Sequence, residues 1–195
     1  MALTGGIACG KSKVAGFWRR WGAEMLDADE IAHRLIAPGG VCVDAVQQAF
    51  GPRIWTPDGG INRARLADIV FADAAARQRL NDLLHPPVIR RMRQWAEGIR
   101  REGLVGVAVI PLLFETGTEK EWDAVVCVAS AEPTILDRLE RRGLTAEQAR
   151  ARLASQWPVS EKAARADRVI ENNGSLAELE AQSRAVWKEL IEEGE

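Results

Sequence analysis

Eight consecutive residues near the N-terminus have the types and the spacing of a loop that binds phosphate groups. They match the pattern G-x-x-x-x-G-K-[ST] in full: Gly5-Gly6-Ile7-Ala8-Cys9-Gly10-Lys11-Ser12. Glycines let the backbone turn several N–H groups toward phosphate oxygens, and a helix N-terminus adds partial positive charge. Lys11 can then reach the β- and γ-phosphates of a nucleotide, and the Ser12 hydroxyl can ligate Mg²⁺. The alternative is a glycine-rich turn in which Lys-Ser occurs by chance.

The segments on either side of this loop are those that nucleotide binding requires. Met1–Thr4 is predicted as the end of a strand. Lys11–Trp21 is predicted as a helix, because apolar residues recur at helical spacing along it. Pattern and context agree, so we interpret the loop as a phosphate-binding loop rather than a chance turn. We interpret Cys9 as a small loop filler, and a redox role stays open because a helix N-terminus lowers a thiol pKa.

Four further segments are predicted as strands that complete a parallel sheet. They are Ala23–Leu26, Val105–Ile110, Asp123–Val128 and Arg168–Ile170. The second and third are continuous apolar runs, as expected of strands that are buried on both faces. Helical segments alternate with these strands, and the last helix is predicted over Leu176–Glu193. The sequence therefore predicts an α/β fold of the P-loop NTPase class, with three α/β/α layers and a five-stranded parallel sheet.

Two long segments between these strands are predicted to be mainly helical. The first runs from Glu30 to about Gly103, and the second runs from Pro133 to about Ala164. Within the second, Arg138 and Arg142 are four residues apart and are predicted to share a helix face. The two guanidinium groups could neutralise ATP phosphates in the transition state. The alternative is a solvated basic helix that forms salt bridges with the acidic residues beside it.

Composition and charge exclude several classes of function. The chain has 195 residues, of which 47% are hydrophobic and 28% charged, which suits one globular domain with inserted sub-domains. Its net charge of −2 does not attract nucleic acid or an anionic membrane. Three cysteines without a CxxC pair, and no visible signal peptide, lead us to expect a cytoplasmic protein without disulfides.

An aspartate after the second predicted strand is the candidate general base. Phosphoryl transfer to a hydroxyl needs a group that orients the nucleophile and accepts its proton. Asp29 follows the carboxyl end of a strand, which is where such sheets bind their ligands. The alternative is that Asp29 caps the next helix. No aspartate ends the Val105–Ile110 strand, so metal support is expected from Asp29, Glu115 or water.

Several segments together resemble the dephospho-CoA kinase family. In chain order they are Leu3-Thr4-Gly5-Gly6-Ile7 with Gly10-Lys11-Ser12, Asp27-Ala28-Asp29 with Ile31-Ala32-His33, Leu84-His85-Pro86, Pro111-Leu112-Leu113-Phe114-Glu115, Gln156, and the run from 166 to 174. Their order and spacing cover almost the whole chain, and the Asp-Ala-Asp and Pro-Leu-Leu-Phe-Glu segments are more specific than the phosphate loop. The resemblance implies transfer of the γ-phosphate of ATP, with Mg²⁺, to the ribose 3′-hydroxyl of dephospho-CoA. The products would be CoA and ADP, in the final step of coenzyme A biosynthesis.

The resemblance also implies a division of the chain and a set of site residues. The core would comprise about 1–28, 104–132 and 166–195, a helical CoA-binding insertion about 29–103, and a lid about 133–165. The expected catalytic residues are Asp29, Lys11 and Arg142, with Ser12 at the metal. The expected ATP contacts are Gly5, Gly6, Ala8, Cys9, Gly10, Lys11, Ser12, Lys13, Arg138, Arg142 and Asn173. The expected substrate contacts are Thr4, Asp29, His33, Arg34, His85, Leu112, Leu113 and Phe114. For the two histidines a structural role stays open, and for the last three residues a place in the core.

Some residues depart from the family's pattern, and two other functions stay open. Ala8-Cys9 stand where the family usually has Gly-Ser, and alanine adopts a positive φ less readily than glycine. Lys13 stands where the family usually has Thr or Ser. The alternatives are another small-molecule P-loop kinase and a nucleotide-dependent switch, although a guanine-selective Asn-Lys-x-Asp motif is absent. We expect no nucleic-acid or membrane partner, and a monomer or weak homo-oligomer.

Overall fold

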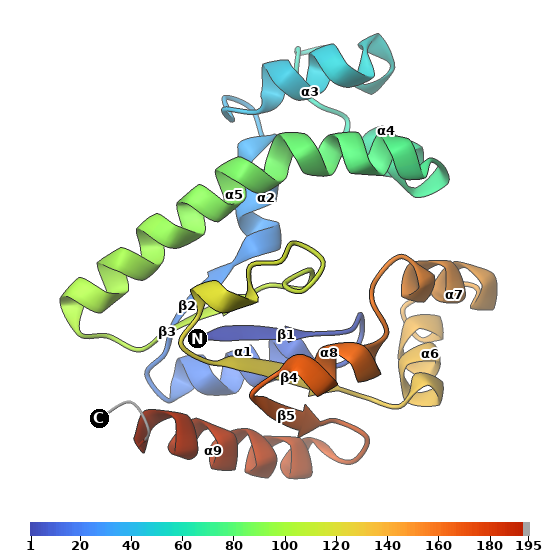
Figure 1. Cartoon of the computed structure of the whole chain (residues 1–195). Coiled ribbons are helices and arrows are strands. Elements are labelled where there is room, and N and C mark those ends of the chain that lie inside the picture. The colour runs from blue at the N-terminus through green and yellow to red at the C-terminus, as the bar shows by residue number, and fades with distance from the viewer. Residues whose placement is uncertain (193–195) are drawn as a thin grey trace. The chain divides into compact units, whose positions relative to one another are not determined.

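A computed structural model describes residues 1–192, and in it the chain forms two compact units (Figure 1). The first unit consists of Met1–Leu26 together with the chain from Ile99 onward, and it contains nearly all of the sheet. The second unit, Asp27–Gly98, is helical. Each unit buries its own set of apolar side chains.

The sheet has five strands in the described part of the chain. They are β1 (Ala2–Gly5), β2 (Glu24–Asp27), β3 (Gly106–Val109), β4 (Val125–Ala129) and β5 (Arg168–Glu171). Their order is β2-β3-β1-β4-β5, and β1 pairs in parallel with both β3 and β4. β2 and β3 lie on one side of β1, and β4 and β5 lie on the other side. Ligands of such sheets bind beyond the carboxyl ends of the strands at this switch point, which is where the glycine-rich loop follows β1.

One face of the sheet is covered by α1 (Lys11–Arg20) and α9 (Leu176–Glu192). The inward side chains of the central strands pack there in one apolar cluster with the helices. Trp18 of α1 is fully buried in this cluster, and its indole N–H donates a hydrogen bond of 3.1 Å to the Ser183 carbonyl of α9. The Trp18 ring also lies 5.6 Å from the Trp187 ring, between centroids. The two helices are thereby fixed to each other as well as to the sheet.

The opposite face of the sheet is covered by α8 (Val159–Arg165), which contacts β1 and β4 (Figure 1). Successive side chains of a strand point to opposite faces, so Thr4 and Cys127 point toward α8. Two helices precede α8, namely α6 (Glu132–Glu140) and α7 (Ala146–Ala154), and they contact each other. Thr145 and Gln148 form a capping box at the start of α7, which separates it from α6.

The second unit is built from helices. They are α2 (Ala28–Leu35), α3 (Val43–Phe50), the short 3₁₀ helix η1 (Pro52–Ile54), α4 (Arg63–Ala72) and most of α5 (Ala74–Glu102). Each of them turns at least one apolar residue into the interior, as Ile31, Val46, Ile54, Leu66 and Leu84 do. The remaining short helix, η2 (Glu119–Glu121), belongs to the first unit.

The predicted α/β class and the five-stranded parallel sheet are confirmed. The segment predicted as helical over 133–164 divides into α6, α7 and α8. The prediction that Arg138 and Arg142 share a helix face is wrong, because α6 ends at Glu140 and Arg142 lies in the turn that follows. The end predicted for the last helix, Glu193, lies outside the described residues. None of the helices within residues 1–192 is both long and apolar enough to span a bilayer.

Candidate active site

The glycine-rich loop has a conformation that only some residues can adopt. Gly5, at the end of β1, has φ 140°, and Gly10, just before α1, has φ 102°. A Cβ at Gly5 would overlap the Val128 carbonyl oxygen of β4, and a Cβ at Gly10 would overlap the Asn172 side chain. Positive φ and close packing therefore both require glycine at these two positions. Ala8 has φ 57°, so it adopts the left-handed conformation despite its methyl group.

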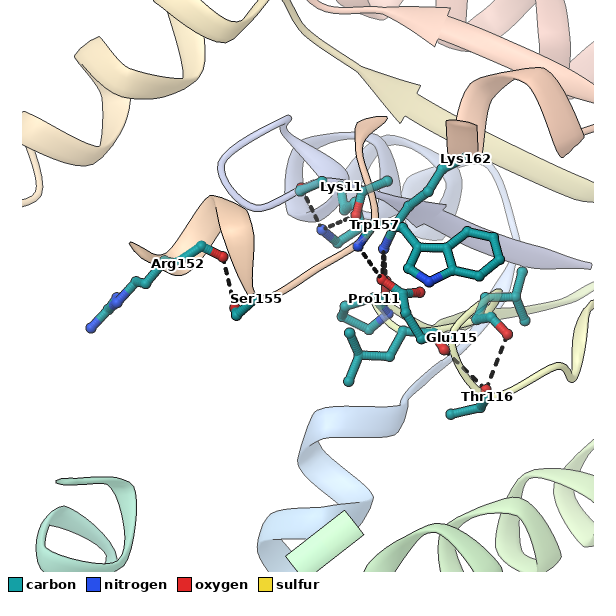
Figure 2. Close-up of polar contacts among 12 residues, drawn as sticks. Lys11, Pro111, Glu115, Thr116, Arg152, Ser155, Trp157 and Lys162 are labelled. Atoms are coloured by element: carbon teal, nitrogen blue, oxygen red, sulfur yellow. Dashed lines mark hydrogen bonds and ion pairs between the residues drawn. The ribbon is translucent and has the colours of Figure 1, made fainter. Parts of the chain in front are cut away.

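The residues expected to bind phosphate lie together at the start of α1. The Lys11 ammonium donates hydrogen bonds to the Gly5 carbonyl at 3.0 Å and the Gly6 carbonyl at 2.8 Å, as Figure 2 shows for this side chain. Ser12 and Lys13 are exposed in the first turn of the helix. The first N–H groups of a helix lack partners within it, and they attract anions. The loop thus combines a cation, a hydroxyl and a helix N-terminus in one place.

A polar network holds the loop from behind. Arg138 of α6 donates to the Ala8 carbonyl at 3.1 Å, to the Ser130 hydroxyl at 3.0 Å and to the Asn172 carbonyl at 2.9 Å. The Asn172 side-chain amide donates to the Cys9 carbonyl at 2.8 Å. Sequence reasoning expected Arg138 to meet ATP phosphates and did not single out Ser130 or the Asn172 amide. In the structure the Arg138 guanidinium holds the phosphate loop.

Asn173 joins the ends of β4 and β5. Its side-chain oxygen accepts from the Ala131 amide at 2.7 Å, and its amide nitrogen donates to the Glu171 carboxylate at 3.1 Å. Arg142, by contrast, is exposed beyond the end of α6. The structure therefore brings Asn173 close to the network behind the loop and leaves the Arg142 side chain in solvent.

The thiols of this unit are buried and neutral. Burial raises the pKa of the Cys9 thiol, although the Lys11 ammonium acts in the opposite direction. Burial also raises the pKa of Cys127 to about 12. Reactive cysteines are exposed thiolates with a lowered pKa. The structure therefore favours the interpretation of Cys9 as a loop filler over a redox role.

A cavity of about 790 Å³ adjoins the phosphate loop. Its walls include Gly6, Ile7, Ser130, Gln156, Trp157 and Asn173, which come from the loop, the ends of β4 and β5, and the segment before α8. The volume is in the range of pockets that hold small ligands. This unit therefore offers both a loop that can bind phosphates and an adjacent cavity that is open to solvent on one side.

Three of the expected substrate contacts in this unit are interior residues. Thr4 and Leu113 are fully buried, and Phe114 is buried with its ring stacked on Trp157 at 6.4 Å between centroids. Leu112 is only partly buried. Leu113 and Phe114 thus pack in the interior of this unit, and their contact with substrate stays a prediction.

The remaining expected residues lie in the second unit. The Asp27 carboxylate caps α2, because its Oδ1 accepts from the Asp29 amide at 2.8 Å and the Glu30 amide at 3.3 Å. Asp27 rather than Asp29 is therefore the helix cap, and Asp29 is exposed in the first turn. His33 lies four residues after Asp29, on the same side of α2. Arg34 pairs with Glu30 at 2.7 Å on the surface.

The second unit also contains a cavity, and sequence reasoning missed the residues around it. The cavity has a volume of about 470 Å³ and is lined by Leu35, Val41, Pro87, Arg90, Arg91 and Gln94. The two arginines follow His85 closely on α5. Burial lowers the pKa of His85, with the Asp82 carboxylate acting in the opposite direction. Consecutive arginines beside a predicted substrate histidine were a signal in the sequence that could have identified this site.

The residues of the first unit fit a magnesium–nucleotide complex better than a metal held by the protein alone. Within residues 1–192 there is no group of three His, Cys, Asp or Glu side chains that could hold a metal ion. Mg²⁺ typically keeps several waters and takes one or two protein oxygens together with substrate phosphates. The exposed Ser12 hydroxyl beside the phosphate loop suits this role. Glu115, one of the expected supports, instead accepts hydrogen bonds from Lys162 and the Trp157 amide.

Known proteins resemble this chain over nearly its full length. The family model described as dephospho-CoA kinase matches residues 1–178. The chain is 43% identical over 191 residues to the dephospho-CoA kinase of Geobacillus kaustophilus, which covers 97% of this chain and 95% of that protein. It is 42% identical over 190 residues to the dephospho-CoA kinase of Symbiobacterium thermophilum, covering 96% of this chain and 80% of that protein.

Solved structures agree with these sequence matches. TT1252 from Thermus thermophilus superimposes with a TM-score of 0.79 at 35% identity, covering 97% of this chain and 96% of that one. The dephospho-CoA kinase from Campylobacter jejuni superimposes with a TM-score of 0.75 at 27% identity, covering 100% of this chain and 98% of that one. The chain belongs to the dephospho-CoA kinase family.

Proposed function

We propose that this protein transfers the γ-phosphate of Mg²⁺-ATP to the ribose 3′-hydroxyl of dephospho-CoA, giving CoA and ADP. The observation that carries the proposal is a complete phosphate loop between β1 and α1 in a member of this family. The loop offers backbone donors, the Lys11 ammonium and the Ser12 hydroxyl to the nucleotide. Phosphoryl transfer depends mostly on positioning and charge stabilisation, which these groups can supply.

Each half of the reaction is assigned to its own residues. Lys11 would stabilise charge on the transferred phosphoryl group, and Ser12 would ligate the Mg²⁺ that the nucleotide brings. Arg142, on the proposed lid of residues 133–165, would approach the phosphates when the lid closes. Asp29 would accept the proton of the attacking hydroxyl, since Asp27 already caps the helix and leaves the Asp29 carboxylate in the first turn. Asn173 would lie on the adenine side of the nucleotide.

The acceptor is assigned to the second unit. His33, Arg34 and His85 are its expected contacts, and the cavity beside Arg90 and Arg91 adds two guanidinium groups for a pyrophosphate. Dephospho-CoA carries both a pyrophosphate and a long pantetheine arm, and the cavity lining combines apolar side chains with these two arginines. The lining is thus chemically suited to a ligand of mixed character.

The test is direct formation of CoA. Purified protein is incubated with Mg²⁺-ATP and dephospho-CoA, and CoA is measured by mass spectrometry, beside a panel of nucleosides, nucleotides and sugar acids. Lys11→Ala is expected to lower kcat/KM by about 10²- to 10³-fold, and Asp29→Asn by about 10²- to 10⁴-fold. Matched controls are Lys188→Ala on α9 and Asp68→Asn on α4, both exposed positions, and these should retain wild-type rates. Binding of ATP without any CoA would refute the proposed acceptor and direct attention to the panel.

A further inference from the structure

One carboxylate oxygen in the first unit accepts hydrogen bonds from two separate parts of the chain. Glu115 lies in the loop after β3, and its Oε1 accepts from the Lys162 ammonium of α8 at 2.7 Å and from the Trp157 backbone N–H at 3.0 Å. Lys162 also donates to the Pro111 carbonyl at 2.7 Å. Figure 2 shows the Lys162 ammonium and the Trp157 backbone N–H both reaching the Glu115 carboxylate.

This ion pair is removed from water. The Lys162 side chain is 0% exposed and that of Glu115 is 16% exposed. The cost of removing two charges from water often exceeds their mutual attraction, so apolar residues of similar shape can serve stability equally well. Stability alone therefore gives a weak account of the pair. The bond to the Trp157 N–H gives it a second consequence, because it fixes the position of a backbone segment.

The segment that Glu115 fixes forms part of the wall beside the phosphate loop. Gln156 and Trp157 line the cavity of about 790 Å³. The Trp157 ring stacks on the Phe114 ring, and the Arg165 guanidinium lies 4.6 Å from the centroid of the Trp157 ring. Two residues on, Val159 packs so closely on Gly6 that a Cβ on Gly6 would overlap it. A continuous chain of contacts thus leads from Glu115 to the phosphate loop.

We propose that Glu115 is a positioning residue, which holds residues 156–159 against the phosphate loop through the Trp157 amide. Lys162 compensates its charge and ties it to the Pro111 carbonyl. Glu115 contacts neither nucleotide nor metal in this role. A displaced segment would change the shape of the cavity and separate Val159 from Gly6. The role in the reaction rests on the proposed function, whereas the role in holding the segment does not.

Two double variants separate positioning from charge compensation. Glu115→Gln with Lys162→Met keeps an oxygen acceptor for the Trp157 N–H, and Glu115→Met with Lys162→Met has a side chain of the same length without one. Both remove the ion pair and both leave the Pro111 carbonyl without Lys162, so they differ in the glutamine amide, whose oxygen can accept from the Trp157 N–H. Hydrogen exchange at the Trp157 amide is measured in the nucleotide-free protein, and kcat and KM for ATP are measured with dephospho-CoA.

The Gln variant is expected to keep wild-type exchange and kcat/KM. In the Met variant, loss of one hydrogen bond should raise exchange at Trp157 and lower kcat/KM for ATP, each by about tenfold. Equal exchange and equal kcat/KM in the two variants would overturn the proposal and leave Glu115 as the counter-charge of Lys162. If the Met variant does not fold, the Gln variant alone tests the proposal. Faster exchange at the Trp157 amide in the Gln variant than in the wild type would then overturn the proposal. If the wild-type protein forms no CoA but the two variants show the expected difference in exchange at Trp157, only the proposed function is refuted.

Discussion

Replacement of Arg138 by methionine should destabilise the protein even when no nucleotide is bound. The guanidinium donates three hydrogen bonds, to Ala8, Ser130 and Asn172, across three segments of the first unit. Hydrogen bonds from a charged donor contribute about 1.5–3 kcal/mol each, but bonds within one network do not add. The Asn172 carbonyl keeps a second donor, the Ser130 hydroxyl at 2.7 Å. We therefore expect a loss of about 2–3 kcal/mol in the free energy of unfolding.

The matched control is Arg142→Met. Arg142 is exposed beyond the end of α6, so its replacement should change the free energy of unfolding by less than about 0.5 kcal/mol. Thermal unfolding followed by circular dichroism or calorimetry, without nucleotide, compares the two. For a chain of this size, the loss at Arg138 corresponds to a fall in Tm of about 5–10 °C. Removal of a phosphate ligand alone would leave the Tm of the nucleotide-free protein unchanged.

The two results therefore separate two roles for Arg138. A fall in Tm for Arg138→Met alone means that the arginine holds the phosphate loop before ATP arrives. A Tm equal to that of Arg142→Met, with only KM for ATP raised, would refute the reasoning. In that case the bond to the Ala8 carbonyl contributes nothing that the solvent does not replace.

Three other predictions concern the backbone and two titratable groups whose pKa is shifted by burial. Gly5→Ala should lower the free energy of unfolding by more than about 3 kcal/mol or prevent folding, because its Cβ would meet the β4 backbone. In the control Gly16→Ala, in α1, the new Cβ meets nothing, and the free energy of unfolding should rise by about 1 kcal/mol. Chemical denaturation compares the two variants. Burial raises the pKa of the Cys127 thiol to about 12 in the folded protein. As the pH rises above about 8.5, the thiol loses its proton in the unfolded chain but not in the folded one, so the free energy of unfolding should fall. Cys127→Ala should flatten that fall in urea titrations at several pH values. Burial lowers the pKa of His85 in the folded protein, so below about pH 6.5 the unfolded chain is protonated more readily than the folded one. The free energy of unfolding should therefore fall as the pH drops below about 6.5, and it should fall less in His85→Gln.

The parts of the fold that could be predicted from the sequence are those with strong local signals. The apolar run that includes Val107 predicted a buried strand, and the structure has β3 there. The breaks in the arginine-rich segment also had local signals that were not used. Gly143 has φ 86°, Thr145 and Gln148 form a capping box, and Pro158 precedes α8. A helix is ended by such residues regardless of how many arginines surround them.

The parts of the site that could not be predicted depend on contacts between distant residues. Lys162 is a charged residue in an amphipathic helical pattern, and such residues are usually solvated. It is buried because Glu115 and the Pro111 carbonyl lie opposite it, at separations of 47 and 51 residues along the chain. Arg138 was predicted as a phosphate contact from its charge and its spacing from Arg142, and its bond to the Ala8 carbonyl spans 130 residues. One sequence contains the residue types but not these pairings.

Ala8 illustrates how such pairings alter the interpretation of a motif. Among the non-glycine residues of the described chain, it alone has a positive φ, at 57°. This conformation costs alanine about 1–2 kcal/mol, which explains why glycine suits the position better. The Arg138 bond to the Ala8 carbonyl and the Asn172 bond to the Cys9 carbonyl both oppose relaxation of the loop. Strained residues persist where their surroundings determine their conformation. The contacts behind the loop therefore hold Ala8 in a conformation that glycine would adopt without this cost.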